Sequence, residues 1–215
     1  MMKRVLLLLI FVHSVYADDF SPQLLINTSC LGQIQGELNP KVRNVRQFIG
    51  IPFAQPPIGS LRFLPPSPLP PFNGSSTDIY NATAAAHQGG FPKFTCMQYS
   101  SANGIIGQED CLYLDIHLPL NIDNGTLLPV VIYIYGGGFQ TSSSQNPTDL
   151  VSTYQNVIYV AIRYRINVFG FIATTILSEI RPGPVQSSGL HGFEDQQLAI
   201  KWVRDNIQGK HNKID

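Results

Sequence analysis

Three consecutive glycines, Gly136, Gly137 and Gly138, directly follow the apolar run VVIYIY at residues 130–135. Glycine lets the backbone turn sharply and lets a ligand come close to the main-chain N–H groups. Two such N–H groups aimed at one oxygen atom stabilise the negative charge that a carbonyl oxygen develops during acyl transfer, and one donor contributes about 3 kcal/mol. The triplet therefore predicts a turn suited to a developing oxyanion.

Two other interpretations of the glycine triplet are open on these residues alone. The first is phosphate binding at backbone N–H groups. The chain has no GxxxxGKS or GxxxxGKT pattern, and no GxGxxG follows a strand, so the sequence gives this interpretation little support. The second is a tight turn that binds nothing, because glycine-rich turns are common.

The flanking segments predict the elements that would hold the triplet. The runs at 129–135 and 157–161 are almost wholly apolar, which is typical of strands in a sheet covered on both faces. At 193–208 the apolar residues recur with the helical period, and Glu194 and Asp195 lie in the first turn, where the helix dipole favours anions. Buried strands followed by an amphipathic helix indicate α/β architecture. Further short strands are expected at 31–37, 45–51 and 111–118, with an irregular proline-rich stretch at 55–72.

The composition is that of a folded domain without a dominant charge. Of 215 residues, 44% are hydrophobic and 13% are charged, and 14 basic residues balance 14 acidic ones. This length supports one domain with a sizeable core, and the composition excludes a disordered chain. A net charge of zero argues against nucleic acid or an anionic membrane as the partner, since both attract basic proteins.

The amino terminus has the pattern of a secretory signal peptide. Lys3 and Arg4 precede an unbroken apolar run at 5–12, and cleavage is expected after Ala17. A membrane anchor is the alternative, but a helix of that run spans only about 12 Å, against about 30 Å of hydrocarbon. We therefore expect a signal peptide at 1–17 and a mature secreted, extracellular domain at 18–215. Sequons for N-glycosylation support this route and lie at Asn27, Asn73, Asn81 and Asn124.

The three cysteines are Cys30, Cys96 and Cys111. In an oxidising compartment a disulfide is expected. The sequence alone allows any one of three pairs and leaves one thiol over.

Five segments, in order, resemble the type-B carboxylesterase and cholinesterase family. They are IGIPFA with GSLRF at 49–63, EDCLYLDI at 109–116, the glycine triplet with its strand, RYRINVFGF at 163–171 and GFEDQQLAIKWV at 192–203. The EDCLYLDI segment is highly specific, and together the five span nearly all of the expected mature chain. The resemblance implies the amino-terminal part of an α/β-hydrolase fold, with a mostly parallel central sheet that is incomplete in this chain.

The same resemblance assigns roles to particular residues. It implies that Gly137 and Gly138 donate N–H groups to the oxyanion of a small carboxylic ester, attacked by a serine to form an acyl-enzyme. That chemistry needs no metal and no organic cofactor. The resemblance also implies a Cys96–Cys111 disulfide with Cys30 unpaired. Finally, it implies two structural ion pairs, Arg62–Glu109 and Arg165–Asp195.

The sequence departs from the family at the catalytic triad. No G-x-S-x-G, the form of the nucleophile elbow, occurs in these 215 residues, and the family's acid and histidine follow that elbow. His191 and His211 match no triad position, so we expect the first to cap or pack and the second to be solvated. The loop 96–111 lacks the tryptophan that binds choline in cholinesterases. Choline esters are therefore not favoured, because Tyr99 is a poor substitute and Trp202 is expected in the core.

The sequence thus predicts the amino-terminal portion of a secreted carboxylic ester hydrolase that is inactive alone. The alternative is a non-catalytic, cholinesterase-like adhesion or binding protein; the residue at the elbow in any longer product discriminates the two. A complete short secreted protein is a third interpretation. It would leave the strand at 157–161 beside an open sheet edge, which invites aggregation. The identity of the ester and the oligomeric state stay open.

Overall fold

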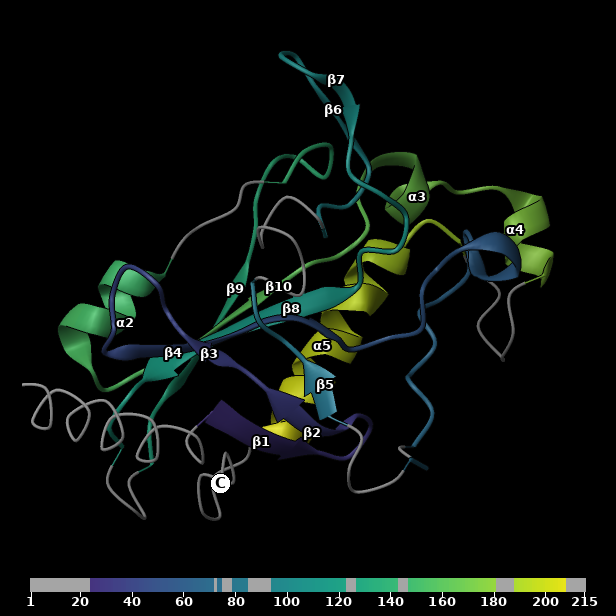
Figure 1. The fold of residues 1–215 in the computed structure, drawn as a ribbon. Helices are drawn as coiled ribbons and strands as arrows, with labels where there is room; N and C mark the ends of the chain where they lie inside the picture. The colour runs from purple at the N-terminus through teal and green to yellow at the C-terminus, as the bar shows by residue number, and fades with distance from the viewer. Residues whose placement is uncertain are drawn as a thin grey trace, which may run out of the picture.

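The structure is a computed structural model and describes residues 24–71, 73–74, 79–84, 94–122, 127–142, 147–180 and 188–207. The expected signal peptide, Asn124 and His211 lie outside the described residues. In the second half of the chain, strands at 113–119, 130–134 and 158–162 are followed by a long helix at 191–206, as the apolar pattern predicts (Figure 1).

A five-stranded sheet forms the centre of the molecule (Figure 1). Its strand order is β3 (Glu37–Leu38), β4 (Val45–Pro52), β8 (Tyr113–Pro119), β10 (Ile158–Ile162) and β9 (Val130–Ile134). Only β9 and β10 pair in parallel, with Ile158 opposite Val130, and the other three pairings are antiparallel.

The expectation of a mostly parallel sheet is therefore wrong for the described strands. A parallel pair needs a crossover connection, which is usually helical. Only β9 and β10 have one, since helix α2 (Thr148–Tyr154) lies between them in the sequence. The expected open edge beside 157–161 is also wrong. Strand β10 lies between β8 and β9, so the described edge strands of this sheet are β3 and β9.

Smaller elements surround the central sheet. Strands β1 (Leu25–Thr28), β2 (Gly32–Gln35) and β5 (Ile79–Asn81) form a second sheet, and β6 (Gln98–Ser100) pairs with β7 (Gly104–Ile106) as a projecting hairpin (Figure 1). The proline-rich stretch contains one short 3-10 helix, η2 (Gly59–Leu61). The other helices of the described residues are α3 (Asn167–Phe171), α4 (Thr175–Ile180) and α5 (His191–Asn206).

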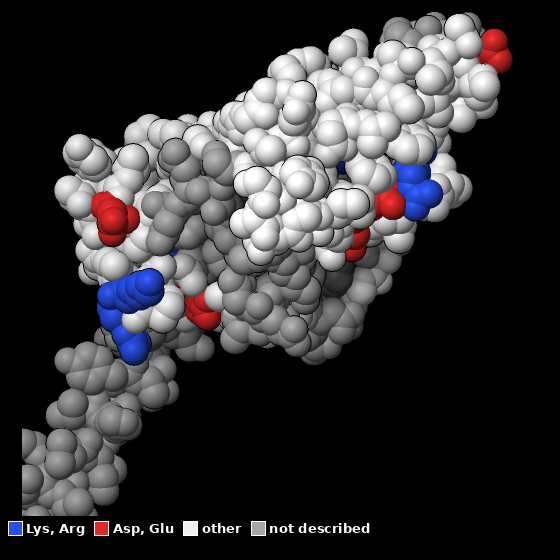
Figure 2. All heavy atoms as spheres, turned by 90° about the horizontal axis from the view of Figure 1, so that it is seen from above, with Lys and Arg blue, Asp and Glu red and all other residues white. Residues whose placement is uncertain are grey.

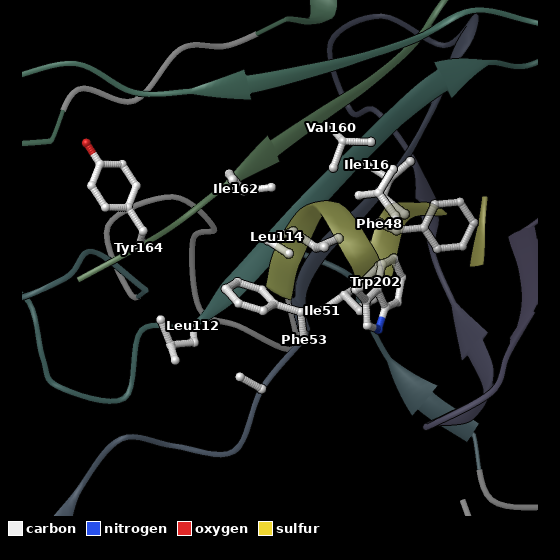
Figure 3. Packing of buried hydrophobic residues seen from close by; sticks show 14 of the residues in the cluster. Phe48, Ile51, Phe53, Leu112, Leu114, Ile116, Val160, Ile162, Tyr164 and Trp202 are labelled. Atoms are coloured by element: carbon white, nitrogen blue, oxygen red, sulfur yellow. The ribbon is translucent and has the colours of Figure 1, made fainter. Parts of the chain in front are cut away.

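The central sheet is packed on both faces. Alternate residues of a strand point to opposite faces, and β10 is buried along its whole length. Ile158, Val160 and Ile162 join the core on the α5 side, where Trp202 packs (Figure 3). Tyr159 and Ala161 join a smaller cluster with Val151 of α2 on the other side.

Helix α5 confirms the predicted amphipathic pattern. Its Ala199, Trp202 and Val203 are buried against the sheet, whereas Lys201 and Arg204 are exposed. Strand β9 differs from the prediction of a strand covered on both faces. Its Val131 and Ile134 are 44% and 39% exposed, because β9 borders only β10 among the described strands.

Candidate active site

The glycine triplet leaves the sheet directly after β9 and is anchored there by two stacked tyrosines. The rings of Tyr135 and Tyr164 lie 4.3 Å apart at 15°. The Tyr135 hydroxyl donates to the Tyr164 carbonyl, and the Tyr164 hydroxyl donates to the Tyr135 carbonyl at 2.9 Å. Burial raises the pKa of both phenols, so they stay neutral donors. The reciprocal pair fixes the point at which the glycine turn begins.

Gly137 makes the turn possible. Its carbonyl accepts N–H groups from Gln140 at 3.1 Å and Thr141 at 3.2 Å, and its φ is +141°. A Cβ there would lie 2.1 Å from the Thr141 carbonyl oxygen, so only glycine fits. Gly138 has φ +61°, but a Cβ there would meet no protein atom within 4 Å. The sequence did not predict this difference, because it depends on where Thr141 lies.

The N–H groups of Gly137 and Gly138 are accessible to a ligand. Both residues are exposed, and neither N–H donates a hydrogen bond to another described residue. Since a backbone N–H is a strong donor, the turn presents two adjacent unused donors. The structure thus places both predicted residues next to each other on the surface, just after a sheet strand.

Phe139 holds the far side of the turn. It has φ +61°, a conformation uncommon for a residue with a side chain. Its carbonyl accepts the Asn167 N–H at 2.6 Å. Its ring packs against Phe171 at 4.8 Å and Phe193 at 5.4 Å. These contacts hold Phe139 in its unusual conformation, and sequence reasoning missed them because the three rings come from separate segments.

The predicted ion pair between Arg165 and Asp195 lies beneath this cluster and is present in the structure. Their side chains are 3% and 0% exposed, and the Arg165 NH2 lies 2.8 Å from a carboxylate oxygen. The carboxylate also accepts the backbone N–H and Nε–H of Arg165, each at 2.9 Å. Burial raises the pKa of Asp195 while these hydrogen bonds oppose that shift. The pair ties the start of α5 to the segment after β10.

The second predicted ion pair is also present, on the surface. Arg62 Nε and NH2 donate to both carboxylate oxygens of Glu109, at 2.5 and 2.7 Å. The Arg62 side chain is 43% exposed, so solvent weakens this pair. Glu109 raises the pKa of Arg62, which stays cationic.

A third ion pair was not predicted. Arg163 NH2 lies 2.6 Å from Asp115, with side chains 6% and 0% exposed. Asp115 also accepts the Gly50 N–H at 2.7 Å. The signal was available, because Asp115 is an acidic residue in a mostly apolar strand, and a buried charge needs a partner.

The disulfide prediction is confirmed. Cys96 and Cys111 are bonded, with Cα atoms 5.0 Å apart, and Cys30 is free within the described chain. Trp202 Nε1–H donates to the Cys30 sulfur at 3.3 Å, and burial raises the pKa of that thiol. A protonated thiol is a weak nucleophile, so Cys30 is unsuited to catalysis.

The remaining predicted residues have ordinary positions. His191 starts α5 and is 1% exposed, with Nδ1 3.0 Å from Glu194 and a buried Nε2 that has no hydrogen-bond partner among the described residues. Its burial at the start of the helix agrees with the expectation that it caps or packs there. The sequon residues Asn27, Asn73 and Asn81 are all exposed. Among the described helices, none is both long and apolar enough to cross a membrane.

Comparison with known proteins extends the similarity across the chain. The model of the Carboxylesterase family matches residues 22–209. Venom carboxylesterase-6 of Apis mellifera is 34% identical over 223 residues, covering 99% of this chain and 36% of the relative. Acetylcholinesterase of Electrophorus electricus is 36% identical over 214 residues, covering 94% of this chain and 31% of the relative. The chain therefore spans about a third of the length of these relatives.

Solved structures show the same fold. A Geobacillus stearothermophilus carboxylesterase superposes with a TM-score of 0.65 at 32% identity, covering 86% of this chain and 35% of that one. A PNB esterase superposes with a TM-score of 0.66 at 29% identity over the same share of each chain. The α/β-hydrolase fold expected from the motifs is confirmed, and the chain belongs to the carboxylesterase family.

Proposed function

We propose that this chain supplies the oxyanion-binding turn of a secreted enzyme that hydrolyses carboxylic esters. The observation that carries the proposal is the pair of exposed N–H groups at Gly137 and Gly138, which no other described residue uses. A turn held in advance at both ends has its donors oriented before charge develops. Such preorganisation is the largest contribution to catalysis in many acyl-transfer enzymes.

In the proposed reaction a serine attacks the ester carbonyl, and the carbonyl oxygen becomes negatively charged. Gly137 and Gly138 donate to that oxygen, and a third donor comes from the residue after the serine. Collapse of the tetrahedral intermediate releases the alcohol and leaves an acyl-serine. Water then hydrolyses the acyl-serine and regenerates the hydroxyl.

The proposed serine, acid and histidine are not among these 215 residues. No G-x-S-x-G occurs in the sequence, and His191, which matches no triad position, is buried. Oxyanion donors without a nucleophile give only weak residual catalysis. We therefore propose that the 215-residue chain alone does not hydrolyse esters and that activity resides in a longer product.

An uncharged ester suits the turn, because residues 136–141 carry no charged side chain. Figure 2 looks down on the end of the molecule from which the β6–β7 hairpin projects, where most of the described residues in view are uncharged. The disulfide-closed loop contributes Tyr99, which is 68% exposed, and no tryptophan. A quaternary ammonium group binds best over an aromatic face, tryptophan above all. We propose a neutral ester in preference to a choline ester.

Secretion and glycosylation belong to the same proposal. The Cys96–Cys111 disulfide is typical of an oxidising compartment. The sequon residues that the structure describes, Asn27, Asn73 and Asn81, are exposed, as glycan attachment requires.

The test compares the 215-residue chain with the longest product of the same gene that carries an elbow motif. A fluorophosphonate probe should label the longer product at its elbow serine, and that product should turn over a p-nitrophenyl ester. The 215-residue chain should do neither. Labelling of a serine within the 215 residues would contradict the assignment. An elbow without serine in the longer product would favour the adhesion alternative.

A further inference from the structure

Both polar atoms of the Gln98 side-chain amide form hydrogen bonds to Ser142, at the end of the glycine turn. Its Oε1 accepts the Ser142 backbone N–H at 2.7 Å, and its Nε2 donates to the Ser142 hydroxyl at 2.5 Å. The same Nε2 donates to the Cys96 carbonyl at 3.2 Å. Gln98 is only 6% exposed, so water does not readily replace these bonds. A buried amide that is fully used in this way fixes both of its partners.

The stretch between the two anchors is short and largely solvent-exposed. Tyr135 fixes its beginning through Tyr164, and residues 136–141 are all exposed. Inside it, the Gly137 carbonyl accepts the Gln140 and Thr141 N–H groups. Phe139 is also held, through its carbonyl and its ring, by Asn167, Phe171 and Phe193. The conformation of Gln140 and Thr141 therefore depends on Phe139 before them and on the Gln98 anchor at Ser142 after them.

The Gln98 anchor is itself tied to the central sheet. The Cys96–Cys111 disulfide lies two residues before Gln98 and two before the start of β8. The neighbouring Met97 carbonyl accepts the Asn167 side-chain N–H at 2.6 Å. A covalent bond and a hydrogen bond therefore hold the main chain that carries Gln98. The Gln98 side chain joins this segment to the glycine turn at Ser142, beside a second link in which Asn167 bonds both the Met97 and the Phe139 carbonyls.

We propose that Gln98 is a positioning residue that couples the Cys96–Cys111 disulfide to the oxyanion-binding turn. Its amide holds Ser142 so that the turn around Gly137 stays closed and the two free N–H groups keep their direction. The coupling stands on the geometry above. Its consequence for catalysis rests on the proposed function.

Amide hydrogen exchange on the 215-residue chain tests the coupling. In Gln98→Leu the Ser142 N–H loses its acceptor directly, so that amide is not informative. The informative amides are Gln140 and Thr141, whose bonds go to Gly137 and not to Gln98. We expect both to exchange about ten-fold faster, the factor for losing about one net hydrogen bond.

Gln108→Leu is the matched control. Gln108 is a glutamine of the same disulfide-closed loop, but its Nε2 donates within the loop, to the Asp110 carbonyl at 2.7 Å. Its removal should leave the Gln140 and Thr141 exchange rates within about two-fold of the parent chain. Gln98→Glu keeps an acceptor for the Ser142 N–H and should lie nearer the parent than Gln98→Leu. Gln98→Glu replaces Gln98→Leu as the test variant if the leucine variant does not fold. Slow exchange of the Val160 amide in β10 shows whether each variant is folded.

A variant without the disulfide tests the link between Gln98 and the disulfide. Replacing Cys96 and Cys111 by serine should speed exchange at Gln140 and Thr141, and adding Gln98→Leu to that variant should cause little further change. Unchanged exchange at these two amides in both Gln98 variants, or the same increase in Gln108→Leu, would overturn the proposal. Fully additive effects of Gln98→Leu and disulfide removal would overturn the coupling.

Kinetics of a longer product that carries the elbow separates this proposal from the proposed function. Gln98→Leu should lower kcat about ten-fold with KM within about two-fold, because the turn acts on the transition state more than on the bound ester. An inactive parent product would refute the proposed function and leave the exchange result to decide the positioning role. An active parent with unchanged kcat in the variant would refute the catalytic consequence.

Discussion

Replacing Asp195 by asparagine removes the negative charge from a carboxylate that solvent does not reach. The side chain is 0% exposed and accepts three hydrogen bonds from Arg165, at 2.8, 2.9 and 2.9 Å. Asparagine keeps the shape but strands the buried guanidinium and turns a donor toward it. Loss of one partner of a buried pair costs about 3–5 kcal/mol. That loss is a large part of the free energy of unfolding of a typical domain, which is about 5–15 kcal/mol.

Urea denaturation of the 215-residue chain at pH 7 measures this loss, and Asp205→Asn is its control. Asp205 lies on the same helix and makes the same charge change, but its side chain is 37% exposed and its partners Lys201 and Arg204 are 62% and 60% exposed. Exposed pairs contribute little, so the control should leave the denaturation midpoint unchanged. Equal shifts in the two variants would refute the assignment of Asp195 as a buried structural charge.

Two further predictions concern the glycine turn and pH. Gly137→Ala should destabilise the chain by more than Gly138→Ala, whose left-handed φ costs about 1–2 kcal/mol, because only at Gly137 does a Cβ meet Thr141, at 2.1 Å. Denaturant midpoints of both variants decide this, and equal midpoints would contradict it. Burial lowers the pKa of His117 from 6.5 to about 4, so the folded state favours the neutral ring. Stability should be full above about pH 6.5 and fall by about 3 kcal/mol toward pH 4. His117→Gln should flatten that profile, and a decline equally steep in the variant would exclude His117 as its source.

Local pattern was sufficient to predict the elements but not their arrangement. The helical period correctly predicts that Trp202 lies on the buried face of α5. The apolar runs correctly predict the strands β9 and β10. Both predictions work because the spacing of apolar residues reflects which side of an element is buried. The order of β9 and β10 in the sheet was not predicted, since pairing depends on contacts between distant segments. The same reason hides the contacts of Gln98 with Ser142, which lie 44 residues apart.

Bonds that hold the candidate site were predictable, but the conformation of its glycine turn was not. The resemblance, and not residue spacing, supplied the Cys96–Cys111 disulfide and the Arg165–Asp195 pair, both of which the structure contains. The ion pair of Asp115 was missed, although its place in a mostly apolar strand is visible in the sequence. The unequal roles of Gly137 and Gly138 follow only from the backbone path that brings the Thr141 carbonyl back over the turn.

The most direct measurement of the proposed oxyanion role is kcat of Gly138→Val in the longer, elbow-containing product. A Cβ at this position meets no described protein atom within 4 Å. The valine side chain would therefore collide with the bound ester carbonyl and not with neighbouring residues of the protein. The account predicts a kcat lower by a factor of about 100 or more, the scale of losing one oxyanion donor, with a variant shown to be folded by its thermal melt. A folded variant with normal kcat would contradict the account and leave the glycine triplet as a turn that binds nothing.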